Sequence, residues 1–208
     1  MPTLPRPLPV VRRITGGGAI WHEHEITYAL VGRAGIDLPE RSRDCYAPLH
    51  TAVLEALSAR GAQLATQQQT SGDRRYRSEP RCFASPAIDD LIIATGAKVL
   101  GSAARQQGDR ILIHGSLKLA SNDWDGAAVA GCGLSAADAG DALLEGLQTF
   151  FAQAAEPGEL QDDEIRLRDE IRAARYGSDA WVRERRGLSA LPYIRQLHTI
   201  FFFASFSH

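Results

Sequence analysis

The sequence predicts one domain that combines short, consecutive strands with helices packed on a common core. Residues 82–119 alternate apolar and polar side chains in three short runs that are separated by turn signals. Residues 48–60 and 135–151 instead repeat their apolar side chains with the period of a helix. A length of 208 residues and a hydrophobic content of 44% are sufficient for one sizeable core.

Charge and cysteine content narrow the classes of partner and compartment. The formal net charge of -2 gives no basic surplus, so we expect neither nucleic acid nor a membrane as a partner. No apolar run approaches the roughly 20 residues of a membrane span. The three cysteines are irregularly spaced, form no C-x-x-C motif and follow no signal peptide, which predicts a reducing, cytoplasmic setting.

Residues 9–14, PVVRRI, are an apolar run that we expect to be a strand ending at a run of three glycines, residues 16–18. Consecutive glycines suit either a ligand loop, where backbone N–H groups approach a bound molecule, or a wide hairpin turn. The next strand is predicted over residues 22–31. His22 and His24 lie two residues apart with neither a cysteine nor a third histidine nearby, so we predict no metal site.

Helical signals follow in three places. Residues 48–60 place Leu49, Val53, Ala56 and Leu57 on one stripe, with Gly61 just past the end. Residues 135–151 begin with a serine cap, and we expect this helix to run to Pro157-Gly158. A charged helix is predicted over 162–176, and Ser178 can cap a last short helix.

The central meander contains the runs LIIA, KVLGSAA and RILIHGSLKL, separated by turns at Thr95-Gly96 and at residues 107–109. Period-two alternation predicts that Lys98 shares one face of its strand with Leu100, Ser102 and Ala104. The chain has two lysines and twenty-one arginines. A lysine can lose its proton when it is desolvated and an arginine cannot, so Lys98 is a candidate functional residue.

Several of these motifs together resemble a known family. RRITGGGAIWH, followed by GAKVLGSAARQ and ILIHGSL, is similar to the biotin/lipoate protein ligase family, within its lipoate-assembly branch, over most of residues 10–186. The resemblance implies an α/β (α+β) fold with a mixed, largely antiparallel sheet flanked by helices. It also implies that the glycine loop and the lysine strand line one acyl-binding tunnel, and that the chemistry concerns octanoyl or lipoyl groups.

Two mechanisms within that branch fit the sequence. Cys82-Phe83 with Pro86 and Asp90-Leu91, and the stretch Glu25 to Tyr28, resemble the cysteine-dependent octanoyltransferases. The stretch GGGA is equally typical of the ligases, which use ATP and magnesium to form lipoyl-adenylate. An inactive, truncated protein that binds an acyl group or a carrier domain is a further alternative.

The transferase interpretation makes Cys82 and Lys98 the catalytic pair and needs no cofactor. Cys82 would carry the octanoyl group as a thioester, and a nearby Lys98 ammonium would favour the thiolate and stabilise the oxyanion. The expected donor is octanoyl-acyl carrier protein, and the expected acceptor is a lipoyl carrier domain, the glycine cleavage H protein or a 2-oxoacid dehydrogenase E2. Cys45 and Cys132 are predicted core residues. The expected substrate-binding residues are Arg13, Gly16, Gly17, Gly18, His22, Gly101, Ser102, His114 and Gly115.

The resemblance also sets the expected domain limits. Residues 1–187 are predicted to form the catalytic domain, N-terminally short because family members usually carry a further segment before the RR-x-x-GG motif. Residues 188–208 form an apolar tail that matches nothing expected of the family. Its run TIFFFASF has no charge and strong strand character, and we predict that this tail packs poorly.

Overall fold

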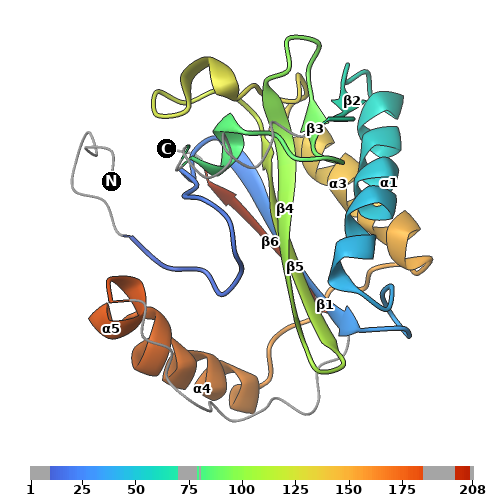
Figure 1. The fold of residues 1–208 in the computed structure, drawn as a ribbon. Helices are drawn as coiled ribbons and strands as arrows, with labels where there is room; N and C mark the ends of the chain where they lie inside the picture. The colour runs from blue at the N-terminus through green and yellow to red at the C-terminus, as the bar shows by residue number, and fades with distance from the viewer. Residues whose placement is uncertain (1–9, 70–78, 80, 185–199, 207–208) are drawn as a thin grey trace. The chain divides into compact units, whose positions relative to one another are not determined.

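A six-stranded antiparallel sheet organises the chain (Figure 1). The structure is a computed structural model that describes residues 10–69, 79, 81–184 and 200–206. The strand order is β2-β3-β4-β5-β1-β6, and each neighbouring pair is antiparallel. The strands are β1 (Glu25–Arg33), β2 (Ala65–Thr66), β3 (Leu91–Ile92), β4 (Lys98–Gln107), β5 (Arg110–Lys118) and β6 (Ile200–Phe206). The predicted fold class, a mixed, largely antiparallel sheet flanked by helices, is confirmed, and all pairs between the described strands are antiparallel.

The predicted central meander is β3, β4 and β5. Strands β4 and β5 pair without interruption from Leu100 opposite Leu117 to Gln107 opposite Arg110, which leaves a two-residue turn between them. Gly108 in this turn has a φ of 60°, a conformation that favours glycine. The tight turn fixes the register of the hairpin, and with it the faces on which the side chains of β4 and β5 lie.

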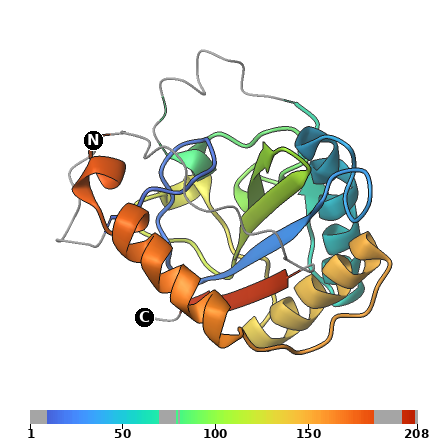
Figure 2. The ribbon, with the colours of Figure 1, turned by 90° about the horizontal axis from the view of Figure 1, so that it is seen from below.

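Helices α1 (Tyr46–Ala59) and α3 (Ala136–Phe151) cover one face of the sheet and pack against each other (Figure 2). The predicted stripe of Leu49, Val53, Ala56 and Leu57 is buried on α1. Gly146 lets the two helices approach closely, because a Cβ atom there would lie 2.6 Å from the Cα of Val53. The main hydrophobic core therefore lies between these helices and the sheet.

The helix ends follow their capping residues. Ser135 caps α3 by accepting a hydrogen bond from the backbone N–H of Asp138 at 3.1 Å, as predicted. The predicted end at Pro157-Gly158 is wrong, because Ala152 adopts a left-handed conformation with a φ of 51° and closes the helix at Phe151.

The predicted N-terminal strand is also wrong over its described part. Residues 10–14 have no regular secondary structure, and Ala19 makes a single bridge to Arg81. Both sides of β1 are already paired, with β5 on one side and β6 on the other, so β1 offers no edge to an additional strand.

The contacts divide the chain into two compact units. One unit contains the sheet with α1 and α3. The other contains residues 1–14 and 156–196, and its described part includes α4 (Asp162–Ile171), a π-helical turn (Arg172–Tyr176) and α5 (Asp179–Val182). Within it Ser178 caps α5 as predicted, and the Trp181 indole donates a hydrogen bond to the carbonyl of Arg12 at 2.9 Å.

The predicted apolar tail contributes a strand to the sheet. Residues 200–206 form β6, whose backbone pairs along β1 from Ile200 opposite Val31 to Phe206 opposite Glu25. The rest of the tail and the predicted boundary at residue 187 lie outside the described residues, so the poor packing of the tail stays a prediction.

Candidate active site

The candidate site lies on the face of the sheet opposite α1 and α3. Ile26, Tyr28 and Leu30 of β1 belong to the helix-covered core. Because side chains alternate between the faces of a strand, the residues between them and their cross-strand partners face the other way. This second face carries Glu25, Thr27, Gly101, His114, Ser116 and Lys118.

The glycine loop lies alongside Cys82 on this face. The backbone N–H of Cys82 donates to the carbonyl of Ala19 at 2.8 Å, and Ala19 forms a parallel bridge with Arg81. Gly17 has a φ of 98°, which an L side chain would rarely adopt. Upstream, the hydroxyl of Thr15 shares a hydrogen bond of 2.6 Å with the His114 ring. The structure therefore brings Gly17, His114 and Cys82 to the same side of the sheet.

Lys98 is buried on this face in an ion pair. Its Nζ lies 2.7 Å from Oδ2 of Asp90, and both side chains are 5% exposed. Asp90 is itself held by the backbone N–H of Ala87, which donates to Oδ2 at 2.6 Å. The ammonium also lies 4.7 Å from the centre of the Phe83 ring, a cation–π distance.

The predicted face of Lys98 is wrong. A Cβ atom on Gly101 would lie 2.2 Å from Cε and 2.4 Å from Nζ of Lys98, so the end of the lysine lies on the face of Gly101 and not on that of Leu100. The reason is a β-bulge, since Ile92 pairs with Lys98 whereas the preceding Leu91 pairs with Leu100. The extra residue on β4 shifts the alternation at this point. Gly101 is the residue that leaves room for the ammonium.

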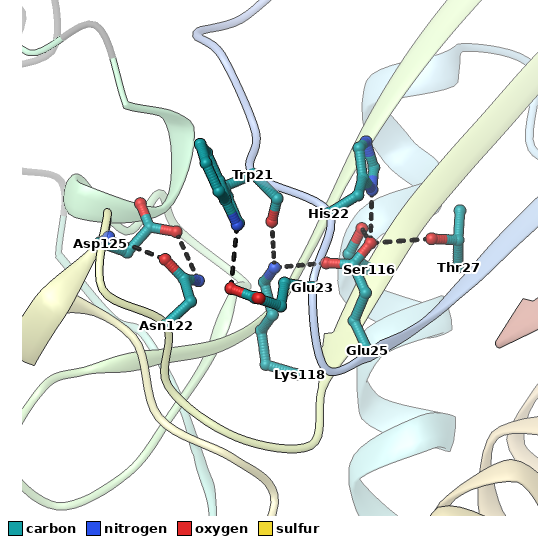
Figure 3. A network of polar contacts seen from close by, with 9 residues as sticks. All are labelled: Trp21, His22, Glu23, Glu25, Thr27, Ser116, Lys118, Asn122 and Asp125. Atoms are coloured by element: carbon teal, nitrogen blue, oxygen red, sulfur yellow. Dashed lines mark hydrogen bonds and ion pairs between the residues drawn. The ribbon is translucent and has the colours of Figure 1, made fainter. Parts of the chain in front are cut away.

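A second buried lysine lies at the end of β5 (Figure 3). Lys118 forms an ion pair with Glu25, both side chains being 0% exposed, and it donates to the carbonyl of Trp21 at 2.7 Å. Oε1 of Glu25 accepts hydrogen bonds from Thr27 at 2.9 Å and Ser116 at 3.1 Å, and from Nδ1 of the half-exposed His22. The predicted site residue His22 is thus tied to the sheet through Glu25.

Electrostatics keep Glu25 charged in this buried place. Burial raises the pKa of its carboxyl, but the hydrogen bond from His22 and the positive charge of Lys118 together outweigh burial. The pKa of Glu25 therefore lies below its usual value. The carboxylate binds His22 directly, and it binds Lys118, which donates to the carbonyl of Trp21. These contacts attach the segment that follows the glycine loop to the sheet.

Phe83 joins the two ion pairs. Its ring centre lies 4.7 Å from Nζ of Lys98 and 5.2 Å from Nζ of Lys118. Phe83 is 2% exposed and lies in the short 3-10 helix Cys82–Ala84. Cys82 is therefore the residue directly before an aromatic ring that contacts both buried ammonium groups.

Two of the predicted site residues, Ser102 and Gly115, lie on the helix-covered side of the sheet. Ser102 faces the core, where its hydroxyl lies 2.5 Å from the Tyr28 hydroxyl and 2.6 Å from Nε2 of His50. Gly115 makes room for Tyr28, because a Cβ atom there would lie 2.6 Å from that ring. Arg13 belongs to the other compact unit. The structure does not bring the side chain of Ser102 to the face that carries Lys98.

The other two cysteines are core residues in the structure, as predicted. Burial, with a smaller contribution from Asp44, raises the pKa of the Cys45 thiol to about 11. Burial also raises the pKa of the Cys132 thiol. Cys82 is partly exposed. Among the described residues, no group of three or more histidine, cysteine, aspartate or glutamate side chains could hold a metal ion.

Glu25, Phe83, Asp90 and Lys118 have roles that sequence reasoning did not assign. One signal was present for Lys118, since period two places it on the face of His114 and Ser116. Its carboxylate partner is more than ninety residues away in the chain, and no local pattern connects the two.

Comparison with known proteins identifies the family of the chain. Residues 5–130 match the family model described as the lipoyl protein ligase A/B catalytic domain. The chain belongs to this family. The matched residues contain the glycine loop, Cys82 and both buried lysines.

Curated members of the family resemble the chain over different lengths. Octanoyltransferase LipM of Moorella thermoacetica is 34% identical over 121 residues, which is 58% of this chain and 44% of that protein. Octanoyltransferase LipM of Brevibacillus brevis is 28% identical over 213 residues, covering 85% of this chain and 75% of that protein. In the first of these matches the chain thus spans less than half of its relative.

Solved structures support the fold. A bipartite lipoate protein ligase of Thermoplasma acidophilum, described with its E2 lipoyl domain, superposes with a TM-score of 0.65 at 16% identity, covering 83% of this chain and 69% of that one. LipL1 of P. falciparum, in complex with lipoate, gives a TM-score of 0.54 at 15% identity, with 90% and 53% covered. Among the described residues of the chain, no helix is long and apolar enough to cross a membrane.

Proposed function

We propose that this chain is an octanoyltransferase of lipoate assembly, which moves an octanoyl group from acyl carrier protein to a lysine of a lipoyl carrier domain. The relatives named octanoyltransferase LipM support this class of activity. The structural observation that carries the proposal is the position of Cys82, directly before the ring that contacts the buried Lys98 ammonium.

The first step is acyl transfer to Cys82. The thiolate attacks the carbonyl carbon of the octanoyl thioester, a new C–S bond forms at Sγ, the bond to the carrier sulfur breaks, and the carrier leaves as a thiolate that takes up a proton in place of the one that Cys82 released. A cysteine with the ordinary pKa of about 8.5 is only a few per cent thiolate at neutral pH, so a nearby cation assists this step. Lys98 is the cation that we assign to it.

Lys98 also suits the tetrahedral intermediate. An ammonium group has three N–H donors, of which Asp90 accepts one. We assign a further N–H of Lys98 to the developing oxyanion, an interaction whose removal typically slows a reaction about 100- to 1000-fold. Burial strengthens such an interaction, because the local dielectric constant is low.

The second step forms the product amide. The lysine amine of the carrier domain attacks the Cys82 thioester, the C–N bond forms, and the thiol of Cys82 is restored as the C–S bond breaks. Because the thioester supplies the driving force, this mechanism consumes no ATP and requires no metal. The acceptor we propose is a lipoyl domain of the kind found in the glycine cleavage H protein or an E2 subunit.

We place the reaction in the cytoplasm. The three cysteines, all of them among the described residues, form no disulfide. Reduced thiols are typical of that compartment, and a catalytic thiol depends on it.

The test is the intact mass of the protein after mixing with octanoyl-acyl carrier protein in the absence of ATP. We expect the mass of one octanoyl group to be added, to be removed by hydroxylamine, and to be absent in Cys82→Ala. Cys132→Ala is the matched control, since it removes a buried thiol and should still be acylated. Acylation of the Cys82→Ala variant, or lipoyl transfer that needs ATP and magnesium and survives this substitution, would replace the proposal with the ligase mechanism.

A further inference from the structure

A chain of buried hydrogen bonds crosses the core on the helix-covered side of the sheet. The Tyr28 hydroxyl of β1 lies 2.5 Å from Oγ of Ser102 on β4, and this Oγ lies 2.6 Å from Nε2 of His50 on α1. Nδ1 of His50 lies 2.7 Å from the carbonyl oxygen of Asp89. His50 is 1% exposed.

The direction of these bonds follows from the last acceptor. A carbonyl oxygen can only accept, so Nδ1 of His50 carries the hydrogen. Burial lowers the pKa of His50 and outweighs the opposing bond to Asp89, so the ring is neutral and its Nε2 accepts from Ser102. Ser102 in turn accepts from Tyr28. His50 is therefore a one-way donor to the loop that contains Asp89.

The acceptor residue has an unusual backbone. Asp89 has a φ of 71°, which a residue with a side chain rarely adopts without support. Its N–H donates to the carbonyl of Gln67 at 3.0 Å, and His50 holds its carbonyl. Both polar groups of this peptide segment are thus fixed in the left-handed conformation.

The next residue is the partner of Lys98. The left-handed turn at Asp89 directs the chain so that Asp90 crosses to the other side of the sheet, where its carboxylate pairs with Lys98 over Gly101. Nδ1 of His50 is the donor that α1 supplies to this turn. A change at His50 is therefore transmitted through one peptide to the carboxylate that orients the ammonium.

We propose that His50 is a positioning residue for Lys98, acting through the carbonyl of Asp89 and the carboxylate of Asp90. The inference rests on the proposed octanoyl transfer for its catalytic consequence, and on the geometry alone for its effect on Lys98. His50 thus contributes to the site although it lies on the opposite face of the sheet.

Two substitutions separate positioning from packing. The amide nitrogen of asparagine reaches the place of Nδ1, so His50→Asn keeps the donor to Asp89 and loses the contact with Ser102. The amide of glutamine reaches the place of Nε2, so His50→Gln keeps the contact with Ser102 and loses the donor. We expect His50→Gln to slow octanoyl transfer to Cys82 at least tenfold with KM little changed, and His50→Asn to rescue most of that loss.

A second measurement reports Lys98 without turnover. Because the chain has two lysines, protein labelled with 13C at the lysine ε-carbon gives two signals by NMR, and Lys98→Gln assigns them. We expect His50→Gln to move the Lys98 signal and leave the Lys118 signal in place, and His50→Asn to move neither. Tyr28→Phe removes the far end of the chain of bonds and is the control that should leave the Lys98 signal unchanged.

The outcomes are distinguishable. Equal rates and an unmoved Lys98 signal in both His50 variants would overturn the positioning role. If the wild-type protein is not acylated at all, the proposed function fails, while the NMR comparison still decides the inference. Should His50→Gln not fold, His50→Leu takes its place, since leucine also lacks the donor, and a Lys98 signal identical to wild type would again overturn it.

Discussion

Removing the charge of Lys118 is expected to destabilise the protein strongly, because the variant Lys118→Met leaves Glu25 buried without its counter-charge. Both side chains are 0% exposed, and breaking a buried ion pair from one side typically costs about 3–5 kcal/mol. We expect the lower end, about 3 kcal/mol, because Oε1 of Glu25 keeps its donors Thr27, Ser116 and His22. With a urea m-value of about 2 kcal/mol per molar, the unfolding midpoint falls by about 1.5 M.

The stability lost in Lys118→Met should depend on pH. The pKa of Glu25 in the folded protein lies below its unfolded value of 4.5, so the charged carboxylate contributes stability above pH 4.5 that is lost as the pH falls through the folded pKa. Without Lys118 the largest remaining influence is burial, which raises that pKa. Glu25 in the variant then takes up a proton on mild acidification, and the penalty of Lys118→Met should be smaller at pH 4 than at pH 7.

The double variant Glu25→Gln with Lys118→Met is the control. It removes both charges and keeps an amide that can accept from Thr27 and Ser116, so we expect it to be more stable than Lys118→Met alone. Urea unfolding at pH 4 and pH 7, followed by circular dichroism, measures the wild type, each single variant (Lys118→Met and Glu25→Gln) and the double variant. A penalty that is equal at the two pH values, or a double variant as unstable as the sum of the single losses, would refute the electrostatic account.

Three further predictions concern close contacts and thiol reactivity. Gly101→Ala places a Cβ atom where the end of the Lys98 side chain lies, so octanoyl transfer should fall at least tenfold and the free energy of unfolding should fall by about 1–3 kcal/mol; a fully active variant would contradict it. Gly146→Ala meets the backbone of Val53, and overpacking of about 2 kcal/mol should outweigh the better helix propensity of alanine, as measured by thermal unfolding. Iodoacetamide at pH 8 should modify Cys82 and spare the two buried cysteines, whose thiol pKa values are raised; mass spectrometry of peptides would show any modification elsewhere.

The elements with a clear period were predictable from the sequence. The meander and α1 each have a local pattern that agrees with its tertiary surroundings, so the stripe of α1 and the turns at Gly96 and Gly108 lie where the sequence predicts them. The N-terminal run PVVRRI has an equally strong apolar pattern, yet residues 10–14 form no strand. An apolar run becomes a strand only if a neighbouring strand has an unpaired edge to receive it. The free edge of β1 is already paired with β6.

The site was predictable in its residue types more than in its geometry. Lys98 was found because lysine is rare in this chain, but its face was not, because a β-bulge leaves no reliable mark in a single sequence. Ser102 is the serine of the motif GSA, and its side chain faces the core. The preceding residue, Gly101, lies beside the Lys98 ammonium on the other face. Along a strand, neighbouring residues of one motif serve opposite faces.

The surroundings of the two buried lysines explain why these two positions are lysine in a chain whose other basic residues are arginines. Each ammonium lies beside a carboxylate and against the ring of Phe83, in spaces that other side chains limit closely. For Lys98 that space exists because Gly101 lacks a Cβ atom, and a planar guanidinium with its five donors would not fit where one compact ammonium does. A carboxylate beside each lysine keeps the buried charges paired. In the proposed mechanism, a further N–H of Lys98 then donates to the oxyanion of the tetrahedral intermediate. The ion pairing that offsets the cost of burying both ammonium groups therefore also orients one of them, Lys98, for its proposed role in acyl transfer.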